Sequence, residues 1–295
     1  MKEIILPEMN PELVSSEIMQ FIVDRVKRVD STGCVIGLSG GIDSSLSAAL
    51  ARRAFENYAS GLELVGYIMP SDVNNPADAE DAINFAESQG IRYGVVDISP
   101  VVESYRMSNP ETFADRRALG NLRSRVRANI LSTKAEIEKK TVCGTGNKDE
   151  DYGLGYYTLF GDGAVHMSPI AGLSKRLVRE MALYLGLSQE QAYRVPTAGL
   201  EPGQSDFRDL GYSYLVAETV IEGRDQGFSL DELKKHPQVI NLVEQGNSDY
   251  ARQFGKAKFS DVGEVVDDIM YRHQGARFKF EVLSPPTPDI TLQYR

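Results

Sequence analysis

Residues 39–45, with the sequence Ser-Gly-Gly-Ile-Asp-Ser-Ser, constrain this chain more than any other stretch. They follow the apolar run 34–38, which is typical of a buried strand, and precede apolar residues at the four-residue spacing of a helix face. The glycines are therefore predicted to form a strand-to-helix turn. Glycine permits positive φ, and the free N–H groups in the first turn of a helix favour an anion. The stretch predicts an anion cradle.

The side chains of this turn narrow the choice of anion. Ser39, Ser44 and Ser45 add hydroxyl donors, and Asp43 adds a carboxylate beside them. A carboxylate next to a phosphate cradle makes chemical sense if a divalent cation bridges the two. No lysine follows the glycines, as a P-loop requires, and no third glycine stands at the dinucleotide-fingerprint spacing. The alternative is an ordinary Gly-Gly turn capped by serine and aspartate.

Composition sets outer bounds on the chain. Its 295 residues are 42% hydrophobic, which predicts one large domain over residues 1–283 followed by a proline-rich tail over 284–295. The net charge of −10 argues against non-specific binding to nucleic acid or to anionic membranes. Neither a signal-peptide core nor a run of membrane-spanning length is present. Cys34 and Cys143 fall in predicted buried strands, so we expect reduced cysteines in a cytoplasmic protein.

The first hundred residues alternate between helix and strand patterns. The predicted elements are a helix over 14–29 that begins at Asn10-Pro11, the strand 34–38, a helix over 46–54, a strand over 62–69, a helix over 79–86 ended by Gly90, and a strand over 91–98. This order predicts an α/β fold with a doubly wound parallel sheet and helices on both faces. Ligands of such sheets bind at the carboxyl ends of the strands, where residues 39–45 lie.

One long helix is predicted from Asp115 to about Lys139. Its buried stripe is expected at Leu119, Leu122, Val126, Ile130, Thr133 and Ile137, and its first half carries Arg116, Arg117, Arg123, Arg125 and Arg127. The arginines have two interpretations that composition does not separate. They are either a solvated basic face or a grip on a phosphorylated substrate.

Four further features follow. They are a glycine turn over 144–150, the turn Gly161-Asp162-Gly163, the turn Ser168-Pro169-Ile170, and Ser174-Lys175 before a helix over 177–185. Each has an ordinary explanation as a turn, a helix cap or a solvated lysine. The three histidines, at 166, 236 and 273, are too scattered to indicate a zinc site.

In this order, however, the set resembles the ammonia-dependent NAD synthetases, which belong to the N-type ATP pyrophosphatases and have an adenine nucleotide alpha hydrolase-like fold. The resemblance covers roughly residues 12–275 and rests on residues 39–45, on Asn121, Arg125 and Arg127, on Gly144, Thr145 and Glu150, on Gly155, Tyr156, Tyr157 and Thr158, on Gly161, Asp162 and Gly163, on Pro169 and Ile170, on Lys175, and on Pro196 and Thr197. Members of this family adenylate the nicotinate carboxylate of deamido-NAD with ATP, releasing pyrophosphate, and ammonia then displaces AMP.

The resemblance implies a role for each matching residue. Asp43 and Glu150 would hold Mg²⁺; Gly37, Ser39, Gly40, Gly41, Asp43 and Ser44 would cradle the phosphates; Thr145, Lys175 and Thr197 would complete the ATP site. Asp162, Lys175 and Asp43 would be catalytic, with Asp162 orienting ammonia and taking its proton. Arg125, His166 and His273 would contact the dinucleotide. Arg125 would do so across a homodimer, for which the stripe of the 115–139 helix is a natural interface.

Three positions depart from the family pattern on the dinucleotide side. Leu159 stands where many members have lysine, His166 where they have aspartate, and His273-Gln274 where they have His-Lys. The alternative is therefore an ammonia-dependent adenylating ligase of the same family that acts on another carboxylate. A sulfur-transferring tRNA enzyme would require reactive cysteines and a basic surface, and this sequence predicts neither. A nucleotide sensor would not need Glu150, Asp162 and Lys175 at these spacings.

Two segments carry further expectations. Residues 201–208 are rich in Gly, Pro and Asp and are predicted to form a mobile lid, and residues 284–288 are predicted to be extended and poorly packed. The roughly 30 residues before the first strand are too few for an amidohydrolase domain. We therefore expect free ammonia, or ammonia from a separate protein, as the nitrogen source.

Overall fold

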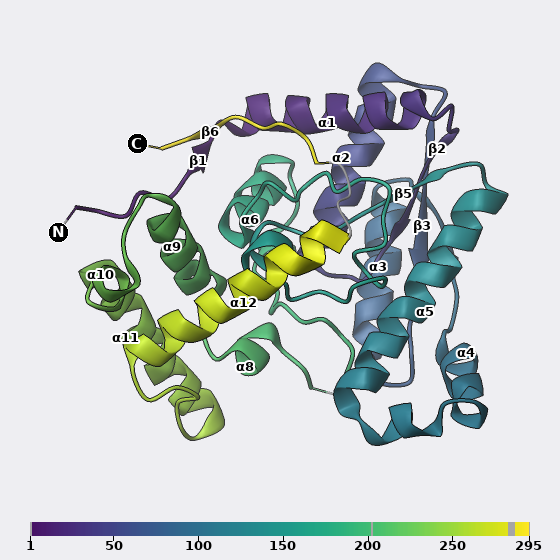
Figure 1. The fold of residues 1–295 in the computed structure, drawn as a ribbon. Helices are drawn as coiled ribbons and strands as arrows, with labels where there is room; N and C mark the ends of the chain where they lie inside the picture. The colour runs from purple at the N-terminus through teal and green to yellow at the C-terminus, as the bar shows by residue number, and fades with distance from the viewer. Residues whose placement is uncertain (1, 202, 283–286, 295) are drawn as a thin grey trace.

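A computed structural model describes residues 2–201, 203–282 and 287–294. Its main sheet has four parallel strands in the order β4-β3-β2-β5 (Figure 1). Their bounds are β2 Gly33–Gly37, β3 Glu63–Ile68, β4 Arg92–Val95 and β5 Thr141–Cys143. The doubly wound parallel sheet predicted from the sequence is confirmed. The predicted strand 91–98 is shorter than expected, because β4 ends at Val95 and a short helix begins at Ser99.

Helices cover both faces of this sheet. One face carries α1 Pro11–Arg28, α2 Ile42–Tyr58, α3 Pro76–Ser88 and α6 Lys175–Tyr184; the other carries α4 Ser99–Ser104 and α5 Arg116–Ile137. Strand side chains alternate between the two faces, as the pleat requires. Cys34 and Ile36 of β2 belong to the core under α1 and α2, whereas Val35 belongs to the core under α5. Both cysteines are buried and free, as predicted.

A layer of helices packs around a separate apolar cluster, on the other side of the molecule from α4 and α5 (Figure 1). Its helices are α9 Tyr214–Asp225, α10 Leu230–Lys234, α11 Pro237–Phe254 and α12 Val262–Val282, and the short helices α7 Gln189–Ala192 and α8 Asp206–Leu210 precede them. A single turn of π-helix, Asp149–Gly153, packs against α9 and α12. This turn follows β5, so the layer reaches the carboxyl end of the sheet.

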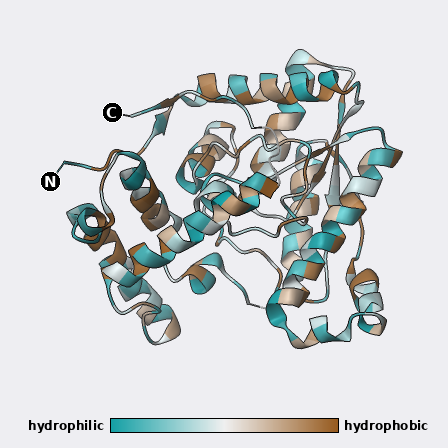
Figure 2. Ribbon diagram, viewed as in Figure 1, coloured by the Kyte–Doolittle hydropathy of each residue, from teal (hydrophilic) through white to brown (hydrophobic). Residues whose placement is uncertain are grey.

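The helix starts agree with the cap signals in the sequence. Asn10 caps α1 and Asp115 caps α5, each with its own side chain. The predicted stripe of α5 is wrong in its second half. Thr133 is exposed and Ile137 is 77% exposed, while the neighbouring Leu131 and Ala135 are buried instead. Figure 2 shows hydrophilic and hydrophobic residues along the whole length of α5, so composition alone does not fix its buried face.

The end of the chain returns to its beginning. Strand β6 Leu292–Gln293 pairs antiparallel with β1 Glu8–Met9 (Figure 1). Thr291 binds the Glu17 carboxylate, and the Tyr294 hydroxyl donates to Glu222 at 3.0 Å. In the part of the predicted segment 284–288 that the structure describes, Thr287 is exposed but Pro288 is buried, so poor packing is wrong for Pro288. The rest of that prediction, at 284–286, lies outside the described residues.

No helix in the described parts of the chain is both long enough and apolar enough to cross a membrane.

Candidate active site

The predicted anion cradle lies at the carboxyl end of β2, where the chain turns into α2. Gly40 has a φ of 78°, and a Cβ atom there would lie 2.5 Å from the Asp78 carbonyl oxygen, so this position requires glycine. The hydroxyl oxygens of Ser39 and Ser44 lie 3.1 Å apart, and Ser44 donates to the Gly41 carbonyl at 2.9 Å. The loop is therefore braced by its own side chains before any ligand arrives.

A cavity of about 820 Å³ opens beside this loop, at the carboxyl ends of β2, β3 and β5. That volume is in the range of small-molecule and cofactor sites. Most of the residues assigned from the sequence line it. They are Gly37, Ser39, Gly41, Asp43, Ser44, Arg125, Thr145, Glu150, Asp162, Lys175 and Thr197. The fold thus brings together residues from both ends of the family pattern.

Lys175 joins the two carboxylates that were assigned to a metal. Its ammonium nitrogen lies 2.5 Å from Asp43 Oδ2 and 2.7 Å from Glu150 Oε1, and its side chain is only 3% exposed. The position of this lysine is fixed by the start of α6, because the Asp149 carboxylate accepts the Lys175 backbone N–H at 2.8 Å. The three charges therefore form one buried cluster at the rim of the glycine loop.

Asn147 connects the Asp43 carboxylate to the backbone of Glu150, a role that was not predicted from the sequence. Its side chain is fully buried; Nδ2 donates to Asp43 Oδ1 and Oδ1 accepts the Glu150 N–H, each at 3.0 Å. One signal was available, since an asparagine side chain in a glycine-rich turn typically binds backbone N–H groups a few residues on.

The pKa values of the cluster follow from burial and charge. Burial acts to lower the pKa of Lys175, but Asp43 and Glu150 outweigh burial and hold that pKa above its ordinary value. Burial raises the pKa of Glu150 to about 7, with Lys175 opposing the shift and Asp43 adding to it. Burial likewise raises the pKa of Asp206, whose carboxylate accepts the Tyr214 hydroxyl at 2.7 Å. A cation bound near Glu150 would therefore favour the ionised form of this carboxylate.

The donor set fits a particular kind of metal site. Within residues 2–201, 203–282 and 287–294, no group of three or more His, Cys, Asp or Glu side chains is placed to hold a metal ion. Asp43 and Glu150 offer two carboxylates. Mg²⁺ commonly binds to one or two carboxylates together with substrate phosphates and water. The residues therefore fit a Mg²⁺ ion that arrives with a nucleotide, and they do not form a complete protein cage.

Asp162 borders the cavity from the turn Gly161–Gly163. Its Oδ1 atom accepts hydrogen bonds from the Ser124 hydroxyl at 2.7 Å and from the Thr158 N–H at 3.0 Å. In the described part of the chain, Oδ2 has no such partner. One oxygen therefore fixes the side chain, and the other is available to a molecule in the cavity.

The five arginines of α5 divide between two roles. Arg127 donates to the Met69 carbonyl at 2.9 Å and to Asn74 at 2.8 Å, and Arg123 donates to the Leu200 carbonyl at 3.0 Å. These two hold the loops that follow β3 and Thr197, and burial lowers the pKa of Arg127 to about 10. The other three, Arg116, Arg117 and Arg125, are exposed. Neither of the two interpretations from the sequence therefore holds for all five arginines, because two of them hold loops of the protein itself.

The two histidines assigned to the dinucleotide lie outside this cavity. His166 is exposed, and its Nδ1 atom accepts the Val142 N–H at 2.9 Å. His273 is buried, with Nδ1 3.0 Å from the Gly153 carbonyl and its ring against Tyr152. The chain does not bring either histidine together with the residues around Lys175.

A different residue of α12 reaches the cavity. Lys279 lines it and donates to the carbonyls of Gly155 at 2.7 Å and Tyr157 at 2.6 Å. Burial lowers the pKa of Lys279, while Asp162 opposes that shift. This ammonium lies on the loop that carries Leu159, where the family pattern has a lysine. This role could not be predicted from the sequence, because helical spacing alone does not show which turn of α12 meets the loop.

A parallel sheet, a glycine loop opening a helix, and a carboxylate pair beside a buried lysine together define an α/β enzyme of the adenine nucleotide alpha hydrolase type. The family model described as NAD synthase matches residues 14–251, which is most of the chain. This chain belongs to the NAD synthase family.

Individual relatives agree with this assignment. The chain is 40% identical over 221 residues to the NH(3)-dependent NAD(+) synthetase of Methanosarcina mazei, covering 74% of this chain and 84% of that protein. It is 34% identical over 269 residues to the enzyme of the same name from Pyrococcus furiosus, covering 89% and 98%.

Solved structures show the same fold. The NMN synthetase of Francisella tularensis has a TM-score of 0.68 at 30% identity and covers 86% of this chain and 98% of its own. The NH3-dependent NAD synthetase of Campylobacter jejuni, in complex with the nitrate ion, has a TM-score of 0.64 at 25% identity and covers 96% and 100%.

Proposed function

We propose that this protein is an ammonia-dependent NAD synthetase, an amide ligase that adenylates the nicotinate carboxylate of deamido-NAD and transfers ammonia to it. NAD, AMP and pyrophosphate are the products. The observation that carries the proposal is the buried Lys175 ammonium between Asp43 and Glu150, beside a glycine loop in an 820 Å³ cavity. Such a cluster provides both signs of charge where a triphosphate and its counter-ion would meet.

In the activation step, the loop Ser39–Ser44 would hold the triphosphate of ATP with backbone N–H and hydroxyl groups. Lys175 would donate to the phosphate oxygens and so stabilise the charge that develops when the carboxylate attacks the α-phosphorus. Asp43 and Glu150 would hold Mg²⁺, which when bound neutralises charge on the triphosphate. Thr145 and Thr197, which line the same cavity, would bound the rest of the ATP site.

In the transfer step, Asp162 would orient ammonia with the oxygen that the protein leaves unbonded, and would take up a proton as nitrogen attacks the adenylate. Ser124 and Thr158 hold the other oxygen, so the carboxylate enters the reaction in a fixed orientation. Arg125 and Lys279 would bind the dinucleotide on the same side of the cavity. His166 is also proposed to contact it, supplied across a homodimer. The expected contact from His273 is not carried forward, because this side chain is buried outside the cavity.

We also propose a compartment, an oligomeric state and a nitrogen source for this enzyme. Two buried free cysteines fit a reducing compartment, and we propose the cytoplasm. The homodimer is proposed to use α5, whose Ile137 is exposed in the single chain. Ammonia, free or from a separate protein, is proposed as the nitrogen source.

The test is pyrophosphate release from ATP, followed with and without deamido-NAD and with and without an ammonium salt. We expect release that depends on deamido-NAD and NAD that forms only when ammonium is present. Nicotinic acid mononucleotide replaces deamido-NAD in a parallel reaction, because a solved relative is an NMN synthetase. Release with the mononucleotide but not with deamido-NAD would overturn the proposed substrate while retaining the ligase class. No release with either acid would overturn the function.

A further inference from the structure

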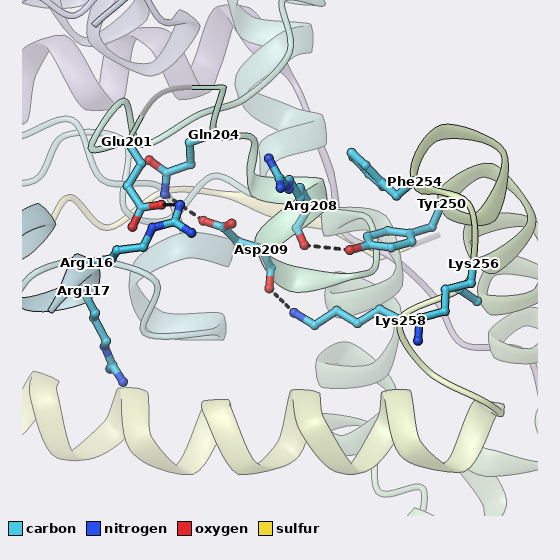
Figure 3. A pocket seen from close by; sticks show the side chains of 11 residues that line it. Arg116, Arg117, Glu201, Gln204, Arg208, Asp209, Tyr250, Phe254, Lys256 and Lys258 are labelled. Atoms are coloured by element: carbon cyan, nitrogen blue, oxygen red, sulfur yellow. Dashed lines mark hydrogen bonds and ion pairs between the residues drawn. The ribbon is translucent and has the colours of Figure 1, made fainter. Parts of the chain in front are cut away.

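A second cavity, of about 750 Å³, lies beside the proposed active site, between the first turn of α5, α8 and the turn that joins α11 to α12 (Figure 3). Five cations and two carboxylates line it, in a chain whose net charge is −10. The cations are Arg116, Arg117, Arg208, Lys256 and Lys258, and the carboxylates are Glu201 and Asp209. The cavity is therefore a local concentration of positive charge on an acidic protein.

Only one of its two carboxylates forms an ion pair with a cation of the cavity, because Glu201 binds Arg116. Asp209 Oδ2 accepts the Tyr156 hydroxyl and the Gln204 amide, each at 2.7 Å, so its charge is directed toward the active-site side of α8. Across the described residues, the side chains of Arg117, Arg208 and Lys256 have neither an ion pair nor a hydrogen bond. Three of the five cations are therefore available to a ligand.

The wall opposite α5 is aromatic and fixed. The rings of Tyr250 and Phe254 lie 4.6 Å apart at the end of α11, and the Tyr250 hydroxyl donates to the Arg208 carbonyl at 3.1 Å. Lys258 reaches back to the Asp209 carbonyl, as the dashed line in Figure 3 shows. The hydrogen bonds of Tyr250 and Lys258 hold α8 in place, so the cavity has its shape without a ligand.

We propose that this cavity binds a polyphosphate anion and is distinct from the cradle at residues 39–45. Guanidinium groups match phosphate oxygens with parallel N–H donors, and here guanidinium and ammonium groups come from three separate elements. Inorganic pyrophosphate and the triphosphate of a nucleotide share this chemistry, and the aromatic wall would favour the nucleotide. The site goes beyond the proposed function and does not depend on which carboxylate the enzyme activates.

The position of Arg116 connects this site to the first cavity. Arg116 pairs with Glu201, and both residues line both cavities (Figure 3). A bound polyphosphate would compete with Glu201 for the guanidinium group. Occupation of the second cavity would therefore release Glu201, which also lines the first cavity.

The test is calorimetric titration of the full-length chain with inorganic pyrophosphate and, separately, with α,β-methylene-ATP. Three proteins are compared: the wild type, the double variant Arg208→Glu with Lys256→Glu, and the matched control Lys27→Glu with Arg28→Glu. Both pairs exchange one arginine and one lysine for glutamate. The control residues are exposed at the end of α1, and none of the four lines the first cavity. Urea unfolding of each protein checks that it folds.

We expect the cavity variant to lose one molar equivalent of bound ligand, or to bind it at least tenfold more weakly, while the control keeps the stoichiometry of the wild type. Loss with pyrophosphate alone assigns the site to the inorganic anion, and loss with the ATP analogue assigns it to nucleotides. Equal stoichiometry and affinity in all three proteins would overturn the proposal. An equal loss in the cavity variant and the control would also overturn it, because net charge would then be the cause.

Discussion

Replacing Asn147 by alanine tests whether the carboxylate cluster depends on one buried amide. The substitution removes two hydrogen bonds at 3.0 Å, one to the Asp43 carboxylate and one from the Glu150 N–H. It leaves the Glu150 N–H and one Asp43 oxygen without their protein partner in a site where Asn147 is fully buried. The Asp43 carboxylate would then be held by Lys175 alone, as the Glu150 carboxylate already is.

The expected cost follows from these contacts. An unsatisfied buried N–H costs about 1–3 kcal/mol, and a hydrogen bond to a charged group contributes about 1.5–3 kcal/mol. Asn147→Ala should therefore lower the free energy of unfolding by roughly 2.5–6 kcal/mol, which is less than the ~10 kcal/mol of a domain in the middle of the ordinary stability range. Misplacement of Asp43 and Glu150 should also lower kcat for pyrophosphate release by about 10- to 100-fold, since each factor of ten is about 1.4 kcal/mol.

The assays are urea unfolding and pyrophosphate release at saturating ATP and Mg²⁺. Asn109→Ala is the matched control, because its amide also donates one hydrogen bond, to Thr112 at 2.7 Å, but lies outside the cavity. We expect the control to lose about 1 kcal/mol or less and to keep its activity. Wild-type kcat and unfolding midpoint in Asn147→Ala would refute the reasoning.

Four further outcomes are expected. Asp43→Asn should abolish pyrophosphate release with an unchanged circular dichroism spectrum; full activity would contradict the metal assignment. Asp162→Asn should release AMP from ATP without forming amide, by chromatography; equal loss of both would place Asp162 in activation. Burial raises the pKa of Asp149 to about 8, so the stability it contributes is present at low pH and lost as pH rises through 8. Asp149→Asn should therefore lose about 1 kcal/mol less unfolding free energy than the wild type between pH 7 and 9; parallel curves would contradict this. Lys279→Met should raise KM for the dinucleotide about tenfold with little change in KM for ATP, and an unchanged ratio of the two would exclude its role.

The parts of the fold that the sequence predicted are those with local signals. The glycine loop, the Asn10 cap and the Asp115 cap each determine where a helix starts from residues close by in the chain. The buried face of α5 has no such signal in its second half. Steps of three and four from Val126 lead through Ile130 to Thr133 and Ile137, whereas the buried Leu131 lies five residues after Val126 and Ala135 four further on. Only the position of the sheet decides between them.

Contacts between distant segments were not predictable from the sequence. Strand β6 pairs with β1 across nearly the whole chain, and nothing in either two-residue strand identifies its partner. The assigned residues that line the cavity, such as Asp43 and Thr145, come soon after parallel strands, whose carboxyl ends meet at one edge. His273 and Lys279 lie on α12, whose register against the loop after the π-turn depends on tertiary packing.

Two departures from the family pattern, at Leu159 and His166, differ in whether the single chain compensates for them. Leu159 removes a lysine from its loop, yet Lys279 places an ammonium on the carbonyls of Gly155 and Tyr157, so the cavity retains a cation there. His166 has a different status, because it is exposed and outside the cavity of its own chain. The proposed contact of His166 with the substrate therefore requires the proposed second copy. The effect of aspartate against histidine at this position is therefore inseparable from the oligomeric state, whereas the effect of Leu159 belongs to the single chain.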